Sequence, residues 1–318
     1  MLYSSPWWLA GGHAQTIYPA TSMQKPEVQL RRERWTTHDQ DFIDVDFLDG
    51  EAGKPFLVLF HGLEGSSNSH YARALMHKLK SLGWSGAVPH FRGCSGEPNQ
   101  APRFYHSGDA QEINWIIRRL HSEFKAAHPL AKFYASGVSL GGNALLRWLG
   151  ESQSSASIVD AACAVSAPLD LTNSGATLSR GFNRIYTKNF LQTLKPKCLH
   201  KLTQFPKLFD REQMLSAKNL YEFDNIVTAP LHGYHDVDDY WHRASACLVL
   251  NDIQIPTLVL NAQNDPFMPA QFLPKVASTY VTLDYPQHGG HVGFAQGSFP
   301  GKLDWLPEKM INHLQTHG

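Results

Sequence analysis

Residues 133–149 are Phe133-Tyr-Ala-Ser-Gly-Val-Ser139-Leu-Gly-Gly-Asn-Ala-Leu-Leu-Arg-Trp-Leu149. The apolar run predicts a strand over 133–138, and the spacing of apolar residues predicts a helix over 140–149. Between them lies a G-x-S-x-G sequence, which would set Ser139 on a sharp strand-to-helix turn, with glycines that let strand and helix approach closely. This context favours an exposed serine nucleophile over a Gly/Ser turn without chemistry.

Short apolar runs alternate with helical patterns on both sides of this motif, which is typical of βα repetition and a mostly parallel sheet. Two early strands, 28–35 and 42–48, are predicted to form an antiparallel edge because the second partly alternates in polarity. Further strands are expected over 56–60, 84–91, 161–166, 256–261 and 280–285, and helices over about 69–83, 109–127 and 303–314.

The βα rhythm breaks between Pro168 and about Asn251, where the chain is polar, rich in aromatic residues and helical in pieces, over 183–194 and 212–223. We therefore expect a catalytic domain over 1–168 and 251–318, with a helical cap over 169–250 inserted between two late strands. Seven aromatic residues of this cap would form either an apolar acyl pocket or the core of the cap itself: Phe182, Tyr186, Phe190, Phe205, Phe209, Tyr221 and Phe223.

A serine hydroxyl needs a base within hydrogen-bond reach, and on a strand–turn–helix elbow the acid and the histidine follow the serine in the chain. Asp265 follows a buried strand, where such an acid belongs, whereas Asp252 precedes that strand and the aspartates of the cap fit a solvated turn. His291 lies in a glycine-rich loop after the last strand, with His288 as its rival. We expect Ser139, Asp265 and His291 to form a catalytic triad.

The sequence His61-Gly-Leu63-Glu-Gly follows the strand over 56–60. A loop of this kind would place the backbone N–H of Leu63 opposite that of Leu140, so that the two donors form an oxyanion hole. We expect the His61 side chain to brace this loop rather than to transfer protons.

Six motifs stand out along the chain: His61-Gly-Leu-Glu-Gly-Ser-Ser67, Phe91-Arg-Gly-Cys-Ser-Gly-Glu-Pro98, Tyr105-His-Ser-Gly108, Gly137-Val-Ser-Leu-Gly-Gly-Asn143, Asn264-Asp-Pro-Phe267 and His288-Gly-Gly-His-Val-Gly-Phe294. Together they resemble the YheT-like group of α/β-hydrolases in the AB hydrolase-4 family, and the segment from Gly12 to Ile17 is also similar to the N-terminal segment of that group. The resemblance spans most of the chain. It implies the α/β-hydrolase fold, an esterase activity, Ser139 as nucleophile, and Asp265 and His291 as its partners.

Composition sets the remaining expectations. Lys plus Arg and Asp plus Glu number 28 each, which does not suggest a nucleic-acid partner. We expect no stable membrane insertion, because the apolar runs are short, and a cytoplasmic location, because no signal peptide is evident. The four cysteines form no CxxC pair and fit reduced thiols. Two HxxH spacings, at His232 and at His288, lack the helical context of a metal site.

The sequence therefore predicts a serine carboxylesterase that acts on a small-molecule ester through an acyl-enzyme and needs no cofactor. An acyltransferase with the same triad is the main alternative, because the two differ only in whether water reaches the acyl-enzyme. A non-catalytic binding protein is the third hypothesis. It is disfavoured because all three triad positions are filled. The sequence leaves the oligomeric state and the chain length of the substrate open.

Overall fold

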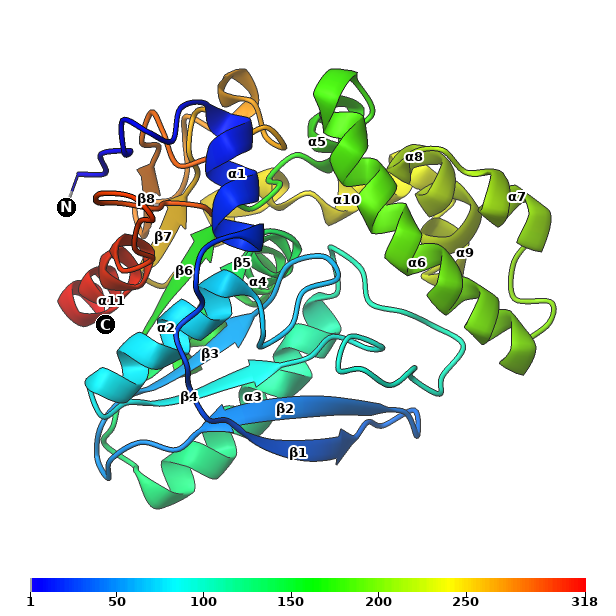
Figure 1. Ribbon diagram of the computed structural model, residues 1–318. Coiled ribbons are helices and arrows are strands. Elements are labelled where there is room, and N and C mark those ends of the chain that lie inside the picture. Colours follow the sequence, from blue (N-terminus) through cyan, green and yellow to red (C-terminus); the bar gives the residue numbers. More distant parts are fainter. Residues whose placement is uncertain (1) are drawn as a thin grey trace.

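Eight strands form the central sheet of the computed structural model, which describes residues 2–318 (Figure 1). β1 (Arg31–Thr36) and β2 (Phe42–Leu48) pair antiparallel at one edge, and β2 is also antiparallel to β4 (Ser85–Pro89), so the predicted antiparallel edge is present. From β4 onward every neighbouring pair is parallel, and the strand order is β1-β2-β4-β3-β5-β6-β7-β8. The other strands are β3 (Phe56–Phe60), β5 (Phe133–Val138), β6 (Ala161–Val165), β7 (Thr257–Leu260) and β8 (Val281–Asp284).

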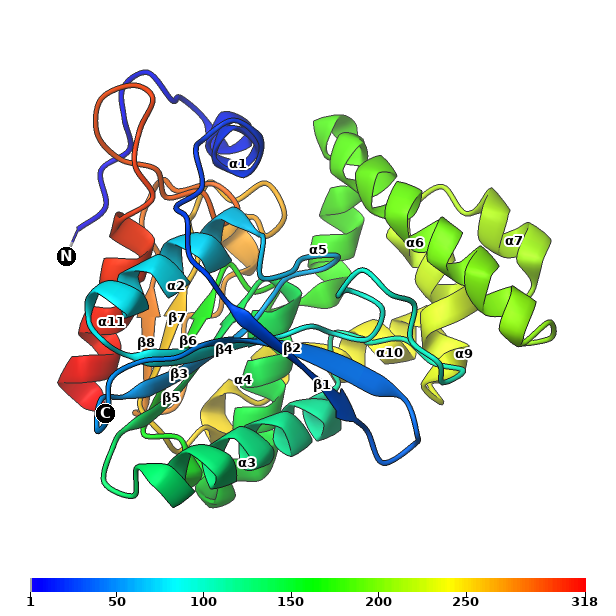
Figure 2. The same ribbon diagram turned by 60° about the horizontal axis from the view of Figure 1, so that its bottom comes forward.

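Helices cover both faces of this sheet (Figure 2). α3 (Ala110–Ala127) and α4 (Leu140–Ser152) pack on one face, and α2 (His70–Ser81) and α11 (Trp305–His317) pack on the other. The strands between these layers are buried on both sides, which explains why β3, β5 and β6 are nearly unbroken apolar or small-residue runs.

Helix α4 does not end at Leu149 as predicted but continues through Gly150 to Ser152. A Cβ atom on Gly150 would lie 2.5 Å from the Cβ atom of Val249. Gly150 therefore permits a close approach of two chain segments and does not stop the helix.

Between β6 and β7 the chain contains helices only, and they stand to one side of the sheet (Figure 1). We call residues 171–244 the helical segment. Its two ends meet: the Leu171 N–H donates to Ser245 Oγ at 2.9 Å, and the Cys247 N–H donates to the Leu169 carbonyl at 2.9 Å. The helices are α5 (Leu171–Leu178), α6 (Arg184–Gln204), α7 (Arg211–Ser216), α8 (Leu220–Phe223), α9 (Ala229–Leu231) and α10 (Val237–Ala244).

Two of these helices differ from prediction. α6 does not end at Leu194 but continues past Pro196, because its buried face extends to Cys198 and Lys201. The helix expected over 212–223 is two helices, since the Asn219 side chain accepts the Glu222 N–H and starts a new one. None of the helices within residues 2–318 is long and apolar enough to cross a bilayer.

Candidate active site

Ser139 occupies a strained position between β5 and α4, with φ 53° and ψ −123°. Such a backbone is costly for a residue with a side chain and persists only where its surroundings enforce it. The flanking glycines are required by contact: a Cβ atom on Gly137 would lie 2.4 Å from the Gly141 oxygen, and one on Gly141 would lie 2.4 Å from the His61 oxygen. The motif therefore forms the sharp turn that its sequence predicts.

The structure brings together Ser139, His291 and Asp265. His291 lies in the loop after β8, and its Nε2 atom is 2.9 Å from Ser139 Oγ. Its Nδ1 atom is 2.9 Å from Oδ2 of Asp265, which follows β7 and whose side chain is fully buried. The other oxygen of Asp265 accepts the N–H of Phe267, and the Phe267 ring stacks on the imidazole at 4.0 Å. These contacts fix both the carboxylate and the plane of the imidazole.

The rival residues lie elsewhere. His288 is exposed, and its Nδ1 atom is 3.5 Å from the side-chain nitrogen of Asn264. Asp252 is exposed in a short turn before β7. Asp236 caps helix α10 by accepting the Asp239 N–H, so this acidic group has a local structural role.

Helix α1 (Gly12–Thr21) supports the histidine loop, and the sequence analysis did not identify this role. Thr16 Oγ1 accepts the N–H of His291 at 2.8 Å. The Gln15 side chain, almost completely buried, accepts the Gly289 N–H at 2.8 Å and the Asn264 side-chain N–H at 2.9 Å. One helix therefore ties the loop of the histidine to the loop of the aspartate.

The glycines of the histidine loop make room for this helix. A Cβ atom on Gly290 would lie 2.8 Å from backbone atoms of Gln15 and Thr16, and one on Gly293 would lie 1.8 Å from the Gln15 oxygen. The only sequence signals for this packing were the Gly-Gly pair before His291 and the family-like N-terminal segment.

The predicted oxyanion donors lie beside Ser139. A Cβ atom on Gly62 would be 3.1 Å from Ser139 Cβ, and Leu63 and Leu140 line the same cavity as Ser139. Within residues 2–318, no acceptor is found for the N–H of Leu63 or of Leu140. Both amides are therefore free to donate to a group bound at the serine.

His61 braces this loop, as expected. Its Nδ1 atom is 2.8 Å from the Gly62 oxygen, and its Nε2 atom accepts the Phe91 N–H at 3.0 Å. This pattern requires a neutral ring that carries its proton on Nδ1. Complete burial lowers the pKa of His61 to about 3, so the ring stays neutral at physiological pH.

Glu64, the next residue of this loop after Leu63, links it to helix α6. Its backbone has a φ of 55°, and its N–H donates to the Tyr105 hydroxyl at 2.8 Å. Its carboxylate accepts the Tyr105 hydroxyl at 3.0 Å and the Lys197 ammonium at 2.7 Å. Lys197 belongs to the helical segment, so one ion pair joins that segment to the loop of the expected oxyanion hole.

Two spaces meet at Ser139. An apolar cavity of about 120 Å³ extends from Ser139 and His291 into the helical segment. A larger, more open groove of about 610 Å³ lies between α1 and the start of α6. Of the seven aromatic residues considered, Phe190 and Phe223 line the cavity. The other five aromatic residues do not line the cavity, and Phe182 and Tyr221 are 50% and 42% exposed.

Two histidines mark the part of the cavity lined by the helical segment. The rings of His106 and His232 are 4.2 Å apart, and the buried Nε2 atom of His232 has no partner within the described chain. Burial lowers the pKa of His106 to about 3 and that of His232 to about 2, so both are neutral.

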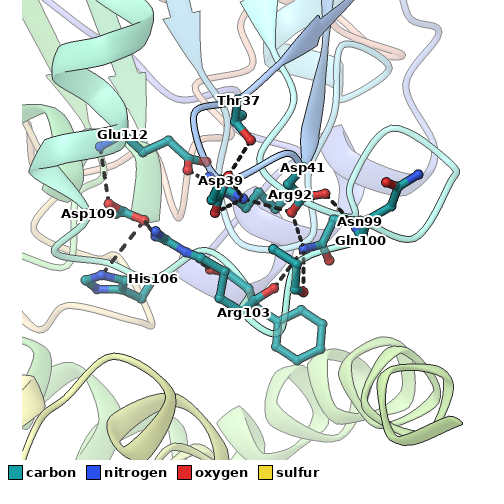
Figure 3. Close-up of polar contacts among 12 residues, drawn as sticks. Thr37, Asp39, Asp41, Arg92, Asn99, Gln100, Arg103, His106, Asp109 and Glu112 are labelled. Atoms are coloured by element: carbon teal, nitrogen blue, oxygen red, sulfur yellow. Dashed lines mark hydrogen bonds and ion pairs between the residues drawn. The ribbon is translucent and has the colours of Figure 1, made fainter. Parts of the chain in front are cut away.

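A buried ionic network supports the loop that carries His106 (Figure 3). Arg92, which is 1% exposed, donates to Asp39 at 2.9 Å, Asp41 at 2.8 Å and Glu112 at 2.7 Å. Burial and the nearby Asp109 raise the pKa of Glu112 to about 7, and Oε1 of Glu112 has no partner among residues 2–318. The crowding of carboxylates around Arg92 therefore makes Glu112 easier to protonate than a free glutamate.

The sequence comparisons agree with this geometry. The family model described as the alpha/beta hydrolase fold matches residues 55–297. YheT of Escherichia coli (strain K12), named as an esterase, is 40% identical over 96% of this chain and 90% of its own. The chain belongs to the α/β-hydrolase family. The expected fold and the resemblance to the YheT-like group are confirmed.

Other relatives of this hydrolase carry related names. Human phospholipase ABHD3 is 29% identical over 98% of this chain and 78% of its own, and monoacylglycerol lipase of Saccharomyces cerevisiae is 30% identical over 84% of this chain and 60% of its own. Among solved structures, the Pyrococcus furiosus esterase Pf2001 superposes with a TM-score of 0.57 at 16% identity, over 93% of this chain and 99% of that one. The last comparison concerns the fold alone.

Proposed function

We propose that this protein is a serine carboxylesterase that hydrolyses its ester through Ser139, His291 and Asp265. Its esterase, phospholipase and lipase relatives, together with its fold, support a carboxylic ester hydrolase. The observation that carries the assignment of residues is the pair of 2.9 Å contacts, from Ser139 Oγ to His291 Nε2 and from His291 Nδ1 to Asp265. The nucleophile is within hydrogen-bond reach of the base, and the base is within hydrogen-bond reach of the group that orients it.

The reaction would follow two acyl-transfer steps. His291 takes the proton of Ser139 as the hydroxyl attacks the ester carbonyl, and then gives that proton to the departing alcohol. His291 next takes a proton from water as that water attacks the acyl-enzyme, and then gives this proton to Ser139 Oγ as the acid leaves, which restores the free serine and the neutral imidazole. Asp265 keeps the proton of the neutral imidazole on Nδ1, so that Nε2 faces Ser139 as an acceptor, and it stabilises the imidazolium.

The free amides of Leu63 and Leu140 would hold the oxyanion in both steps. Each lies next to Ser139 and has no competing acceptor. Removing one donor of such a pair typically costs on the order of a hundredfold or more in rate. The braces at His61 and Glu64 keep the first donor in place.

The two spaces at Ser139 suggest how the substrate lies. The apolar cavity would hold the acyl chain, and the open groove would hold the alcohol portion and admit water. Residues 169–250 would then act as a cap that shapes the acyl site. Access of water through the groove favours hydrolysis over transfer to another acceptor.

Ser139→Ala tests this assignment against a panel of p-nitrophenyl esters from acetate to palmitate. We expect turnover to fall by several orders of magnitude and a fluorophosphonate probe to label only the wild type. Ser155→Ala is the matched control, because Ser155 is exposed, lines neither of the two spaces at Ser139 and donates to the nearby Ser152 carbonyl. Equal rates in Ser139→Ala and wild type would refute the proposal.

A further inference from the structure

One stretch of the helical segment carries positive charge without negative charge. Residues 171–209 contain seven Lys and Arg and no Asp or Glu, although the whole chain has 28 of each kind. The equal numbers of positive and negative residues in the whole chain do not reveal this local excess of positive charge. The seven are Arg180, Arg184, Lys188, Lys195, Lys197, Lys201 and Lys207.

Three of the seven have polar partners within the protein. Lys197 pairs with Glu64, and Lys201 is buried and donates to the Asn99 carbonyl. Lys195 donates to the carbonyls of Leu215 in α7 and of Ala217 just after it. Arg180, Arg184 and Lys188 are exposed, and no ion pair within residues 2–318 engages them. All three lie within nine residues of sequence, Arg180 just before α6 and Arg184 and Lys188 in its first two turns.

Two exposed apolar side chains lie among them. Phe182 is 50% exposed and Ile185 is 55% exposed. Arg184 and Lys188 are four residues apart and share one side of α6, and Ile185 lies between them in sequence on the adjoining side. Residues 180–188 therefore present cations and hydrocarbon on one surface.

This surface borders the route to Ser139. Ile185 lines the groove that reaches Ser139 and His291. The Phe182 ring lies 4.5 Å from the His13 ring of α1, and α1 also lines this groove, through Thr16 and Ile17.

We propose that residues 180–188 are a docking surface for a lipid bilayer that carries anionic headgroups. Phe182 and Ile185 enter the boundary between headgroups and acyl chains, and Arg180, Arg184 and Lys188 contact the headgroups. Binding is peripheral and aims the groove at the bilayer. Ile185 favours a bilayer over a nucleic acid, because an isoleucine side chain, unlike the Phe182 ring, cannot stack on bases.

The proposal is tested by flotation of the full chain with vesicles of phosphatidylcholine alone or with 30% phosphatidylglycerol. Each cation close to an anionic surface strengthens binding about fivefold, so three contribute on the order of a hundredfold. We expect binding to the anionic vesicles only, weakened about a hundredfold in Arg180→Gln/Arg184→Gln/Lys188→Gln. Phe182→Ser/Ile185→Ser should also lose binding.

A matched triple variant, Lys54→Gln/Lys80→Gln/Arg118→Gln, removes the same charge from exposed sites outside the groove and should bind as wild type does. The proposal is overturned if wild type does not bind anionic vesicles, if both triple variants weaken equally, or if a DNA oligonucleotide binds more tightly than the vesicles.

Docking does not depend on the proposed chemistry, so Ser139→Ala should float as wild type does. Loss of ester hydrolysis with binding intact would refute only the proposed function. Hydrolysis of soluble esters without vesicle binding would refute only the docking surface.

Discussion

Replacing Thr16 with valine would remove one hydroxyl from helix α1 and leave the shape of the side chain almost unchanged. In the wild type, Thr16 Oγ1 accepts the N–H of His291 at 2.8 Å and donates to the Gly12 carbonyl at 2.7 Å. After the change, the amide of His291 has no acceptor at its present position. The loop must then leave that donor unpaired or shift to find water.

The expected losses of kcat and of stability depend on whether the His291 amide stays unpaired or the loop shifts. An unpaired buried donor costs about 1–3 kcal/mol. A shift that recovers part of this cost moves the imidazole away from its 2.9 Å contact with Ser139. If about 1.4 kcal/mol enters the barrier, kcat falls tenfold. We expect this tenfold loss in Thr16→Val, with a smaller change in KM and a loss of about 1–2 kcal/mol in unfolding free energy.

The assay is steady-state hydrolysis of a p-nitrophenyl ester, with urea unfolding in parallel. Thr21→Val is the matched control, because Thr21 donates to the Ile17 carbonyl at 2.8 Å on the same helix but does not contact the histidine loop. Thr16→Ser keeps a hydroxyl and should restore most of kcat. If Thr16→Val and Thr21→Val have the same kcat, α1 does not position His291.

Three further predictions concern the surroundings of the site. Lys197→Met should lower kcat/KM at least tenfold, because it removes the hydrogen bond from Lys197 to Glu64, which holds the loop of the proposed oxyanion hole. Hydrogen bonds to charged groups contribute about 1.5–3 kcal/mol. A double-mutant cycle with Glu64→Gln that showed no coupling would contradict this. The folded-state pKa of Glu112 is raised from 4.5 to about 7, so the contribution of Glu112 to stability falls by on the order of 3 kcal/mol as pH rises through this window. In urea unfolding between pH 4.5 and 8, the unfolding free energy of wild type minus that of Glu112→Gln should therefore fall, and a difference that stays constant with pH would mean that the pKa of Glu112 is not raised in the fold. Gly290→Ala should cost several kcal/mol and most of the activity, whereas Gly297→Ala, also at positive φ but with no atom within 4 Å of its added Cβ, should cost about 1 kcal/mol. Similar losses in both would show that strain, and not contact with α1, dominates.

The predictable parts of the site are those encoded by residues close together in sequence. Ser139 could be chosen because strand, glycine turn and helix are consecutive, and each glycine has a contact that forbids a Cβ atom. Asp265 and His291 could be chosen because each follows a recognisable strand in the required chain order. In these cases the local backbone restricts the residue type, so the pattern can be recognised from the sequence alone.

The parts that escaped prediction depend on contacts between distant segments. Gln15 and Gly289 are 274 residues apart, and Glu64 and Lys197 are 133 apart. A glutamine or a lysine on a helix is common, and nothing nearby in sequence distinguishes these two. The break of the helix at Asn219 and the continuation of α6 beyond Pro196 likewise depend on tertiary packing and capping.

The meeting of Leu171 with Ser245 has a consequence for how such an enzyme diversifies. The two ends of this stretch lie side by side, joined there by the Leu171–Ser245 and Cys247–Leu169 hydrogen bonds, while Ser139, Asp265 and His291 all lie outside it. Because its ends already touch, its length and composition can vary with little change in the entropy of closing the loop. The helical segment lines much of the proposed acyl site, so a graft of residues 172–244 from a relative should transfer substrate preference and leave the proposed triad in place.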